Sequence, residues 1–279
     1  MKILFACSEY FPLMRTNDVA DFAAGLTGAI GQLSHDIRVV IPAYPEAVNA
    51  ARPLETLTTL EFAGCEETIR LLKGKVAGQT FPVYLVDAPG MFARHGHPYK
   101  DAQGSLRPDN LKRFALFSQA VSMIALNHAG LSWRPDVVHC NDWQTGLVPV
   151  LLAQDWNRPA TVFSPHQVST KQANAQSALA DLRIPAVIKQ SANCLVGGLF
   201  STLKTGISYS DAVVSSSENF AARYADLPIA DEFKSAFRIL GERFVGIQPA
   251  LDENRWNPVN DDYIQQSFDT TTVYLKERN

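Results

Sequence analysis

Four polar clusters in this sequence each follow a short apolar run, and they carry the side chains that polyhydroxyl ligands need. Carboxylates, amides and histidine can form bidentate hydrogen bonds with sugar hydroxyls, and an aromatic ring can pack on a sugar face. Loops that follow parallel strands gather along one rim of an open sheet. We therefore expect a ligand site on such a rim, built from residues 8–10 with 15–18, 141–144, 164–167 and 215–218.

Local structural roles compete with ligand contact at several of these residues. Ser215 and Glu218 fit an S-x-x-E capping box at the start of a helix. Asp142 suits the N-cap of a helix that begins near Trp143. His166, at the end of a strand, is equally suited to a loop hydrogen bond and to a functional role.

Neither a metal nor a cofactor is expected. The chain has no GxSxG, HExxH, Walker or GxGxxG motif, and Asn17-Asp18 stands where a phosphate cradle would need glycine. A zinc site of His139, Cys140 and His166 is disfavoured because the first two are adjacent in a strand and point to opposite faces. We expect small buried thiols in a reducing compartment at all four cysteines, Cys7, Cys65, Cys140 and Cys194.

Composition and charge favour a cytoplasmic protein with a substantial core. The chain has 279 residues, 46% of them hydrophobic, and a formal net charge of −3. A mildly acidic chain has no general attraction for nucleic acid or an anionic membrane. No run of 18 or more apolar residues occurs, and Ser8-Glu9 interrupts the apolar N-terminus, so neither a membrane span nor a signal peptide is expected.

The hydrophobic pattern alternates between strand and helix periods, which predicts an α/β fold with a doubly wound, mostly parallel sheet. Strands are expected at 2–7, 37–41, 136–140, 160–163, 212–214 and 244–247. Helices are expected between them at 19–34, 110–128, 145–154, 201–210 and 218–224. Three further strands, 57–62, 68–75 and 81–86, read as a hairpin-like excursion, 89–109 as a long loop, and 171–198 as an irregular insertion.

Several segments of the chain, in the same order, resemble glycogen and starch synthases, the ADP-glucose-dependent glycosyltransferases of family five. The resemblance is collinear over about the first 258 residues, so chance ordering does not explain it. The matching segments are 2–12 (KILFACSEYFP), 39–45 (VVIPAYP), 84–89 (YLVDAP), 96–101 (GHPYKD), 109–114 (DNLKRF), 133–139 (WRPDVVH), 141–143 (NDW), 203–206 (LKTG) and 256–258 (WNP).

The resemblance implies one Rossmann-like half of a GT-B protein, an architecture in which two such domains face each other across a cleft. Members of this family make α-1,4-glucan with retention at the anomeric carbon. Residues 1–258 correspond to the first domain, and 259–279 form a tail that corresponds to the start of the interdomain crossing. The second-domain positions that handle the pyrophosphate and sugar in the family have no counterpart in this sequence.

The resemblance also assigns roles to individual residues. It implies that Asp21 and His166 are catalytic residues that orient sugars, and that Arg15 neutralises phosphate. It implies no metal ligand. The remaining residues with an implied role in substrate binding are Tyr99, Asp142, Trp143 and Gln167.

The first βα loop departs from the family pattern. Residues 15–21 read RTNDVAD where the family has KTGGLAD, so Asn17 and Asp18 replace both glycines. Glycine there lets the backbone approach the donor phosphates. Asp18 would add a like charge that costs roughly 1–4 kcal/mol at ~4 Å. We therefore expect ADP-glucose to bind poorly.

Three functions remain open for the chain. The first is a glucosyltransferase unit of the synthase family, with very low activity or none in isolation. The second is a non-catalytic protein that binds α-glucan, maltooligosaccharide or a partner protein. The third is one half of a two-chain glycosyltransferase. A surface normally buried by the second domain is expected to be polar or to be covered in a homo-oligomer.

Overall fold

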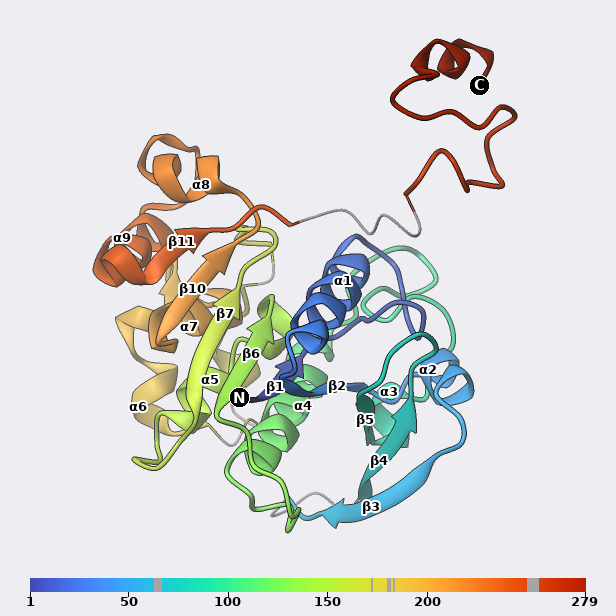
Figure 1. Ribbon diagram of the computed structural model, residues 1–279. Coiled ribbons are helices and arrows are strands. Elements are labelled where there is room, and N and C mark those ends of the chain that lie inside the picture. The colour runs from blue at the N-terminus through green and yellow to red at the C-terminus, as the bar shows by residue number, and fades with distance from the viewer. Residues whose placement is uncertain (63–66, 172, 180–181, 183, 250–255) are drawn as a thin grey trace. The chain divides into compact units, whose positions relative to one another are not determined.

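The computed structural model describes residues 1–62, 67–171, 173–179, 182, 184–249 and 256–279 (Figure 1). The described residues form two compact units, Met1–Gln248 and Pro249–Asn279. The described residues of the second unit include a short 3₁₀ helix, η6 (Val273–Arg278). None of the helices in the described ranges is long and apolar enough to cross a membrane.

A nine-stranded sheet forms the centre of the first unit, in the order β11-β10-β7-β6-β1-β2-β5-β4-β3. Neighbouring strands are parallel from β11 through β5, and β4 and β3 are antiparallel additions. This confirms the mostly parallel sheet and its hairpin-like excursion. The strands are β1 (Lys2–Ala6), β2 (Asp36–Pro42), β3 (Glu55–Leu60), β4 (Ile69–Lys75), β5 (Pro82–Asp87), β6 (Val137–Asn141), β7 (Ala160–Ser164), β10 (Ala212–Ser215) and β11 (Phe244–Gly246).

Helices cover both faces of the sheet, as a doubly wound fold requires (Figure 1). On one face α4, α5 and α7 pack side by side, and α1 lies over the opposite face against β2. Most of α4 is buried, because it lies between the sheet and its neighbours. The helices are α1 (Val19–Gln32), α2 (Pro45–Ala50), α3 (Pro89–Phe92), α4 (Asn110–Ala125), α5 (Val148–Leu152), α6 (Ala186–Lys189), α7 (Thr202–Tyr209), α8 (Glu218–Arg223) and α9 (Asp231–Leu240).

The structure corrects several expected elements. The helix expected at 145–154 is a 3₁₀ turn, η1 (Trp143–Thr145), followed by α5. The expected loop at 89–109 begins with α3. The stretch at 171–198 contains α6, and β8 (Leu195–Val196) pairs with β9 (Leu199–Phe200). These short elements are stabilised by packing: Ile188, Cys194 and Phe200 are buried in one cluster with Leu111 of α4 and Val150 of α5.

One helix was not predicted from the sequence, and one predicted cap does not form. Sequence reasoning missed α9, although Phe233, Phe237 and Leu240 recur at helical spacing and are buried. The predicted capping box at α8 is not formed. Ser217 is the N-cap residue, and its hydroxyl accepts from Phe220 N, whereas the Ser215 hydroxyl accepts from Ser217 N.

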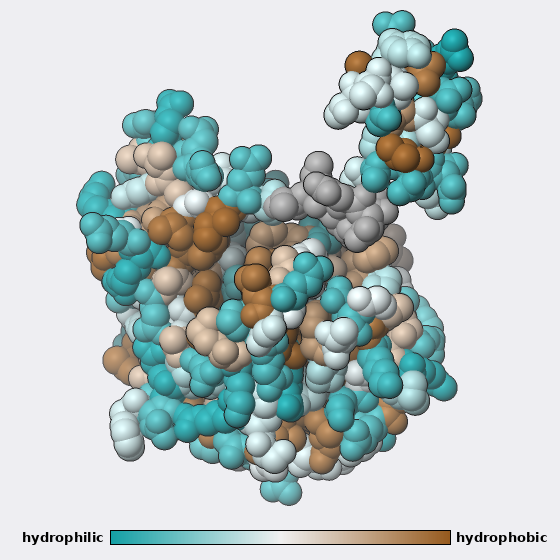
Figure 2. All heavy atoms as spheres, in the orientation of Figure 1, coloured by the Kyte–Doolittle hydropathy of each residue, from teal (hydrophilic) through white to brown (hydrophobic). Residues whose placement is uncertain are grey.

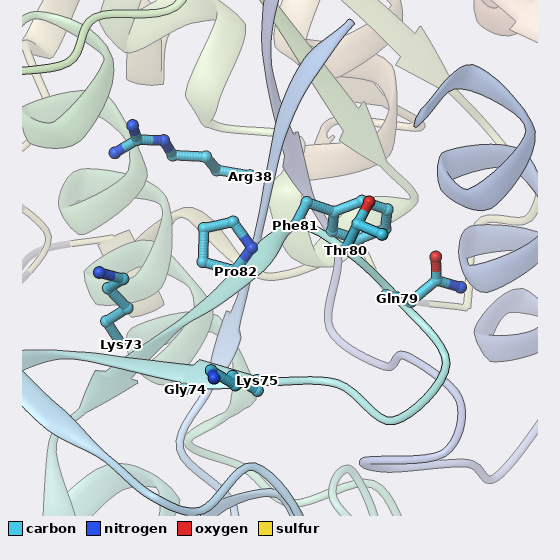
Figure 3. A pocket seen from close by; sticks show the side chains of 8 residues that line it. All are labelled: Arg38, Lys73, Gly74, Lys75, Gln79, Thr80, Phe81 and Pro82. Carbon is cyan, nitrogen blue, oxygen red and sulfur yellow. The ribbon is translucent and has the colours of Figure 1, made fainter. Parts of the chain in front are cut away.

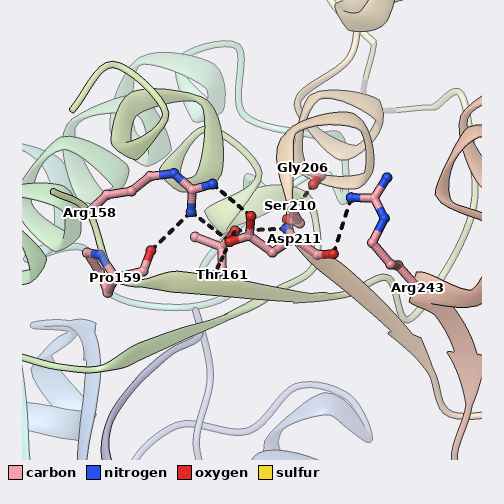
Figure 4. A network of polar contacts seen from close by, with 7 residues as sticks. All are labelled: Arg158, Pro159, Thr161, Gly206, Ser210, Asp211 and Arg243. Atoms are coloured by element: carbon pink, nitrogen blue, oxygen red, sulfur yellow. Dashed lines mark hydrogen bonds and ion pairs between the residues drawn. The ribbon is translucent and has the colours of Figure 1, made fainter. Parts of the chain in front are cut away.

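A network of polar contacts ties the amino ends of β7 and β10 together (Figure 4). Arg158 donates two hydrogen bonds to the Asp211 carboxylate, at 2.6 and 2.7 Å. The backbone N–H and hydroxyl of Thr161 donate to the same carboxylate, and Arg243 donates to the Asp211 carbonyl. Asp211 therefore joins three segments that are distant in the sequence.

Apolar side chains gather at the β11 edge of the sheet. Figure 2 shows hydrophobic residues over α9 and β11, where Ile239, Val245 and Ile247 are exposed. Cys7, Cys140 and Cys194 are buried free thiols, as expected, and Cys65 lies outside the described residues. An exposed edge strand is a surface on which another chain can pair. The homo-oligomer or partner chain expected from the sequence stays a prediction.

Candidate functional site

The carboxyl ends of β1, β6 and β7 lie side by side, because β1, β6 and β7 are consecutive in the sheet order. The polar segments that follow these strands meet on one rim, as the topology predicted. Tyr99 contacts Glu9 of the segment after β1 and Trp143 of the segment after β6. His166, after β7, contacts Asn141 at the end of β6 and Phe22 on α1. The fourth polar segment, 215–218, follows β10 and forms the start of α8.

The buried Glu9 carboxylate holds the first βα loop in place through hydrogen bonds. The carboxylate is fully buried and accepts hydrogen bonds from the Thr16 backbone N–H and hydroxyl and from Asn17 Nδ2. Tyr99 also donates to Glu9, at 2.6 Å, and contacts the Ser8 hydroxyl at 2.7 Å. Sequence reasoning included Glu9 in a polar cluster but gave it no role. A carboxylate directly after a buried strand was the available signal.

Tyr99 is buried, and its hydroxyl is used inside the protein. Burial, with the nearby Tyr44 and Glu9, raises the pKa of Tyr99 well above its usual range. The ring lies 5.8 Å from the Trp143 ring and 5.7 Å from the Phe114 ring, measured between centroids. Tyr99 therefore connects the loop at 15–18 to the aromatic side of the rim.

Arg15 and Asp21 lie close together, and their side chains form an ion pair with each other. Arg15 Nε donates to Asp21 Oδ2 at 2.7 Å. The Asn17 side chain supports the start of α1, because its Oδ1 accepts from Val19 N at 2.8 Å. Asp18 is the N-cap residue, and its side chain makes no capping hydrogen bond. Asn17 thus accepts from one of the free backbone N–H groups at the N-terminus of α1, and the Asp18 carboxylate lies beside it.

His166 lies at the end of β7, where α1 meets the rim. Its Nε2 is 3.1 Å from Asn141 Oδ1, and its ring makes an edge contact with Phe22 at 4.7 Å between centroids. Burial lowers the pKa of His166 to about 4, so the ring is neutral at pH 7. A neutral imidazole can exchange hydrogen bonds with a hydroxyl but gives no net attraction for phosphate.

Asp142 is the most unusual residue of the rim. Its backbone has φ 58° and ψ −177°, a conformation that is strained for any residue with a side chain. Its Oδ1 atom is buried and has no hydrogen-bond partner within the described parts of the chain. Burial raises the pKa of Asp142 to about 7. Asp142 precedes η1, but its side chain makes no capping hydrogen bond, so the capping prediction was wrong.

Strain, an unsatisfied oxygen and a perturbed pKa together are typical of a binding residue. Trp143 follows directly, is partly exposed, and packs edge-on against Phe114 at 5.1 Å between ring centroids. Gln144 contributes a second buried oxygen, Oε1, without a partner in the described chain. Gln167, which was also assigned to substrate, is exposed beyond His166.

No group of three or more His, Cys, Asp or Glu side chains in the described ranges is arranged to hold a metal ion. The zinc site weighed from the sequence does not form there. His139 Nε2 is instead 2.8 Å from the Ser164 hydroxyl, and burial lowers the pKa of His139 to about 3. Its neighbour Cys140 is a buried free thiol.

A mostly parallel sheet with helices on both faces and a polar rim at its carboxyl ends defines a Rossmann-like domain of the GT-B type. The family model for the starch synthase catalytic domain matches residues 2–228. The chain therefore belongs to the family of starch synthase catalytic domains.

Known relatives agree with this assignment. Glycogen synthase 1 of Methylococcus capsulatus is 36% identical over 279 residues, which are 100% of this chain and 56% of that protein. Glycogen synthase of Thioalkalivibrio sulfidiphilus is 36% identical, again over 100% of this chain and over 58% of its own length. The chain thus spans a little over half the length of these relatives.

A solved structure confirms the fold. The catalytic domain of Starch Synthase IV from Arabidopsis thaliana, bound to ADP and acarbose, superposes with a TM-score of 0.80 at 22% sequence identity. The superposition covers 99% of this chain and 57% of that one.

Proposed function

We propose that this domain binds α-1,4-glucan on the rim formed by the ends of β1, β6 and β7, and that its first βα loop does not hold ADP-glucose tightly. The observation that carries the proposal is the Asp142 carboxyl, which is held on a strained backbone with a buried oxygen that has no hydrogen-bond partner in the described chain. A hydroxyl of a bound sugar would satisfy that oxygen.

Other residues of the rim support a glucan ligand. Trp143 supplies an aromatic surface beside Asp142. The neutral His166 ring donates from Nε2 to Asn141 Oδ1, which leaves Nδ1 to accept from a sugar hydroxyl. Sugars are recognised by this combination of an aromatic face and planar polar groups. The homologous synthases and the acarbose-bound starch synthase structure make a glucan the natural candidate.

Side chains of the first βα loop disfavour the binding of a sugar nucleotide. Arg15, the cation that the resemblance assigns to phosphate, is paired with Asp21. Asn17 takes the Val19 N–H, which a pyrophosphate at the helix N-terminus would otherwise use. Asp18 adds a carboxylate at the same place, and one like charge at ~4 Å costs roughly 1–4 kcal/mol. Such a cost lowers affinity by about ten- to several hundred-fold.

Calorimetry with maltoheptaose tests the glucan half of the proposal. The wild-type chain should bind, and Asp142→Asn and Trp143→Ala should each weaken binding roughly tenfold, the loss of about 1.4 kcal/mol. Trp156→Ala is the matched control, because Trp156 is 96% exposed in the loop before β7 and lies away from the rim. Failure of the wild-type chain to bind maltoheptaose would reject the proposal and favour binding of a partner protein.

A glucosyltransferase unit is the second candidate function. It is favoured by the position of His166, whose ring contacts Phe22, the residue after Asp21 on α1. Transfer of glucose from ADP-glucose to glycogen by the purified 279-residue chain measures this directly. We expect very low turnover or none, and robust turnover that His166→Ala abolishes would establish the transferase instead.

The remaining functional expectations stay predictions. They are the catalytic roles of Asp21 and His166, a partner chain that completes a glycosyltransferase, and the domain boundary at residue 258. Light scattering of the purified chain, alone and with maltoheptaose, measures whether a homo-oligomer forms.

A further inference from the structure

A hollow lies near the amino ends of β2 and β5, at the opposite end of these strands from the rim. Its volume is about 440 Å³, within the range of small-molecule sites. Three of the lining side chains are cationic, two are polar and two are apolar, and Figure 3 shows how they lie. The lining residues are Arg38, Lys73, Gly74, Lys75, Gln79, Thr80, Phe81 and Pro82.

The strand register places the cations on one face of the sheet. Lys75 pairs with Pro82 across β4 and β5, and Arg38 lies beside Pro82 because Val39 pairs with Val83 in the parallel β2–β5 ladder. Directly paired residues share a face, and so do residues two apart on one strand. Arg38, Lys75 and Lys73 therefore share a face, and Figure 3 shows Arg38 and Lys73 extending on the same side of Pro82.

The Arg38 guanidinium is fixed in place before any ligand arrives. It lies over the Trp133 ring, with Cζ 4.2 Å from the centroid, and Nη1 donates to the Tyr84 hydroxyl. Its buried Nε has no hydrogen-bond partner in the described segments. Asp36 Oδ1, which forms an ion pair with Nε, lies 3.8 Å away, too far for a hydrogen bond. A guanidinium held by stacking loses little further entropy on binding an anion, which favours recognition of oxyanions.

The charges around the hollow leave an excess of positive charge. Asp36 forms a long ion pair with Arg38, and its Oδ2 accepts from Trp133 Nε1. Glu55 lies 3.4 Å from Lys73 Nζ, and both side chains are largely exposed. The exposed Lys75 ammonium forms no ion pair with any described residue. Three cations thus face two carboxylates, and both carboxylates already have partners: Asp36 on β2 with Arg38 and Trp133, and Glu55 on β3 with Lys73.

We propose that this hollow binds a small molecule that carries a phosphate group, with the phosphate between Arg38, Lys73 and Lys75. Arg38 offers a planar set of donors, and the two lysines add mobile point charges. Phe81 and Pro82 line the rest of the hollow and give an organic ligand an apolar contact. The site is independent of the glucan rim and of the function proposed for it.

Calorimetry at constant ionic strength tests the site with inorganic phosphate and with glycerol 3-phosphate as probes. Both probes share the phosphate group, and both should bind the wild-type chain. Tighter binding of glycerol 3-phosphate supports an organic phosphate as the ligand, and equal binding supports free phosphate. Lys73→Gln/Lys75→Gln should weaken both probes roughly tenfold or more, because two charge-assisted contacts are lost.

The two lysines are exposed, so their replacement leaves the fold intact, which circular dichroism verifies. Lys112→Gln is the matched control, because Lys112 is an exposed lysine on α4, outside the hollow, and its loss should change neither affinity. The proposal is wrong if the wild-type chain binds neither probe. It is equally wrong if the double lysine variant and the wild-type chain bind them alike.

Discussion

Arg15 donates from Nε to Oδ2 of Asp21 at 2.7 Å, so the cation of the first βα loop is neutralised by a carboxylate in the first turn of α1. Both residues were expected to act on a ligand, yet each is the other's partner. A ligand that uses either one must first separate the pair. Exposed pairs of this kind are weak, about 0–1 kcal/mol, so separation is a small barrier. The larger obstacles to an anion are Asn17 and Asp18.

Restoring glycine at both positions should restore affinity for a sugar nucleotide. Asn17→Gly/Asp18→Gly removes one carboxylate and frees the Val19 N–H from the Asn17 side chain. We expect ADP-glucose to bind at least about tenfold more tightly than to the wild-type chain. Calorimetric titration measures the affinity, and Asp18→Asn separates the charge effect from the backbone effect. Unchanged affinity in the double variant would show that the loop does not limit binding.

Asp142 should make the protein less stable as the pH rises. Burial raises its pKa to about 7 in the folded state, from 3.8. Between pH 4 and 7 the folded chain therefore binds more protons than the unfolded chain, and the free energy of unfolding falls with rising pH. The loss is at most about 4 kcal/mol.

Urea unfolding from pH 4 to pH 8 checks this prediction. Asp142→Asn cannot ionise and keeps the shape of the side chain, so it should be the more stable protein at pH 8 and should lose this part of the pH dependence. Asparagine also tolerates positive φ better than most residues. Parallel pH profiles for the two proteins would contradict a raised pKa at Asp142.

Asp211 should contribute stability with the opposite dependence on pH. Hydrogen bonds from Arg158 are the main cause that lowers the pKa of Asp211 to about 2, from 3.8. Its contribution is complete above about pH 4 and disappears as the pH falls towards 2. Because the carboxylate is partly exposed, we expect only about 1 kcal/mol. Asp211→Asn should lower the free energy of unfolding at pH 7 and change it much less at pH 2, measured by urea unfolding.

Gly206 should not tolerate a methyl group. A Cβ atom at this position would lie 2.4 Å from Cε2 of the buried Phe163 ring. Gly206→Ala should therefore lower the free energy of unfolding by roughly 1–3 kcal/mol or more. Gly25→Ala is the control, because a Cβ at that helical position meets no atom within 4 Å. It should raise stability by about 0.5–1 kcal/mol. Equal effects of the two substitutions in thermal unfolding would contradict the packing at Gly206.

Local pattern was sufficient for much of the fold. The strands near residues 2–6, 36–42 and 137–141 are short apolar runs that end in polar loops, and such runs identify themselves without tertiary information. The helix α9, which was not predicted, also has a local pattern, because its apolar residues recur at helical spacing. The division of 145–154 into η1 and α5 also carried a signal, because Pro149 lies in the first turn of α5, a position that proline favours.

The candidate site was predictable only as a neighbourhood. Topology placed the polar segments after β1, β6 and β7 on one rim, and the structure confirms that they meet. The partner of each side chain was not predictable. Tyr99 donates to Glu9 across 90 residues of sequence, and His166 approaches Asn141 across 25.

The amino-acid sequence by itself determined the α/β alternation, the parallel sheet and membership of the synthase family, because periodicity and ordered motifs are properties of the chain read in one dimension. Only the tertiary structure decided that Arg15 neutralises Asp21, that Glu9 anchors the loop, and that Asp142 has a buried oxygen without a partner in the described chain. Hydrogen bonding and desolvation depend on distances that exist only after distant segments have packed together, and sequence spacing does not contain those distances.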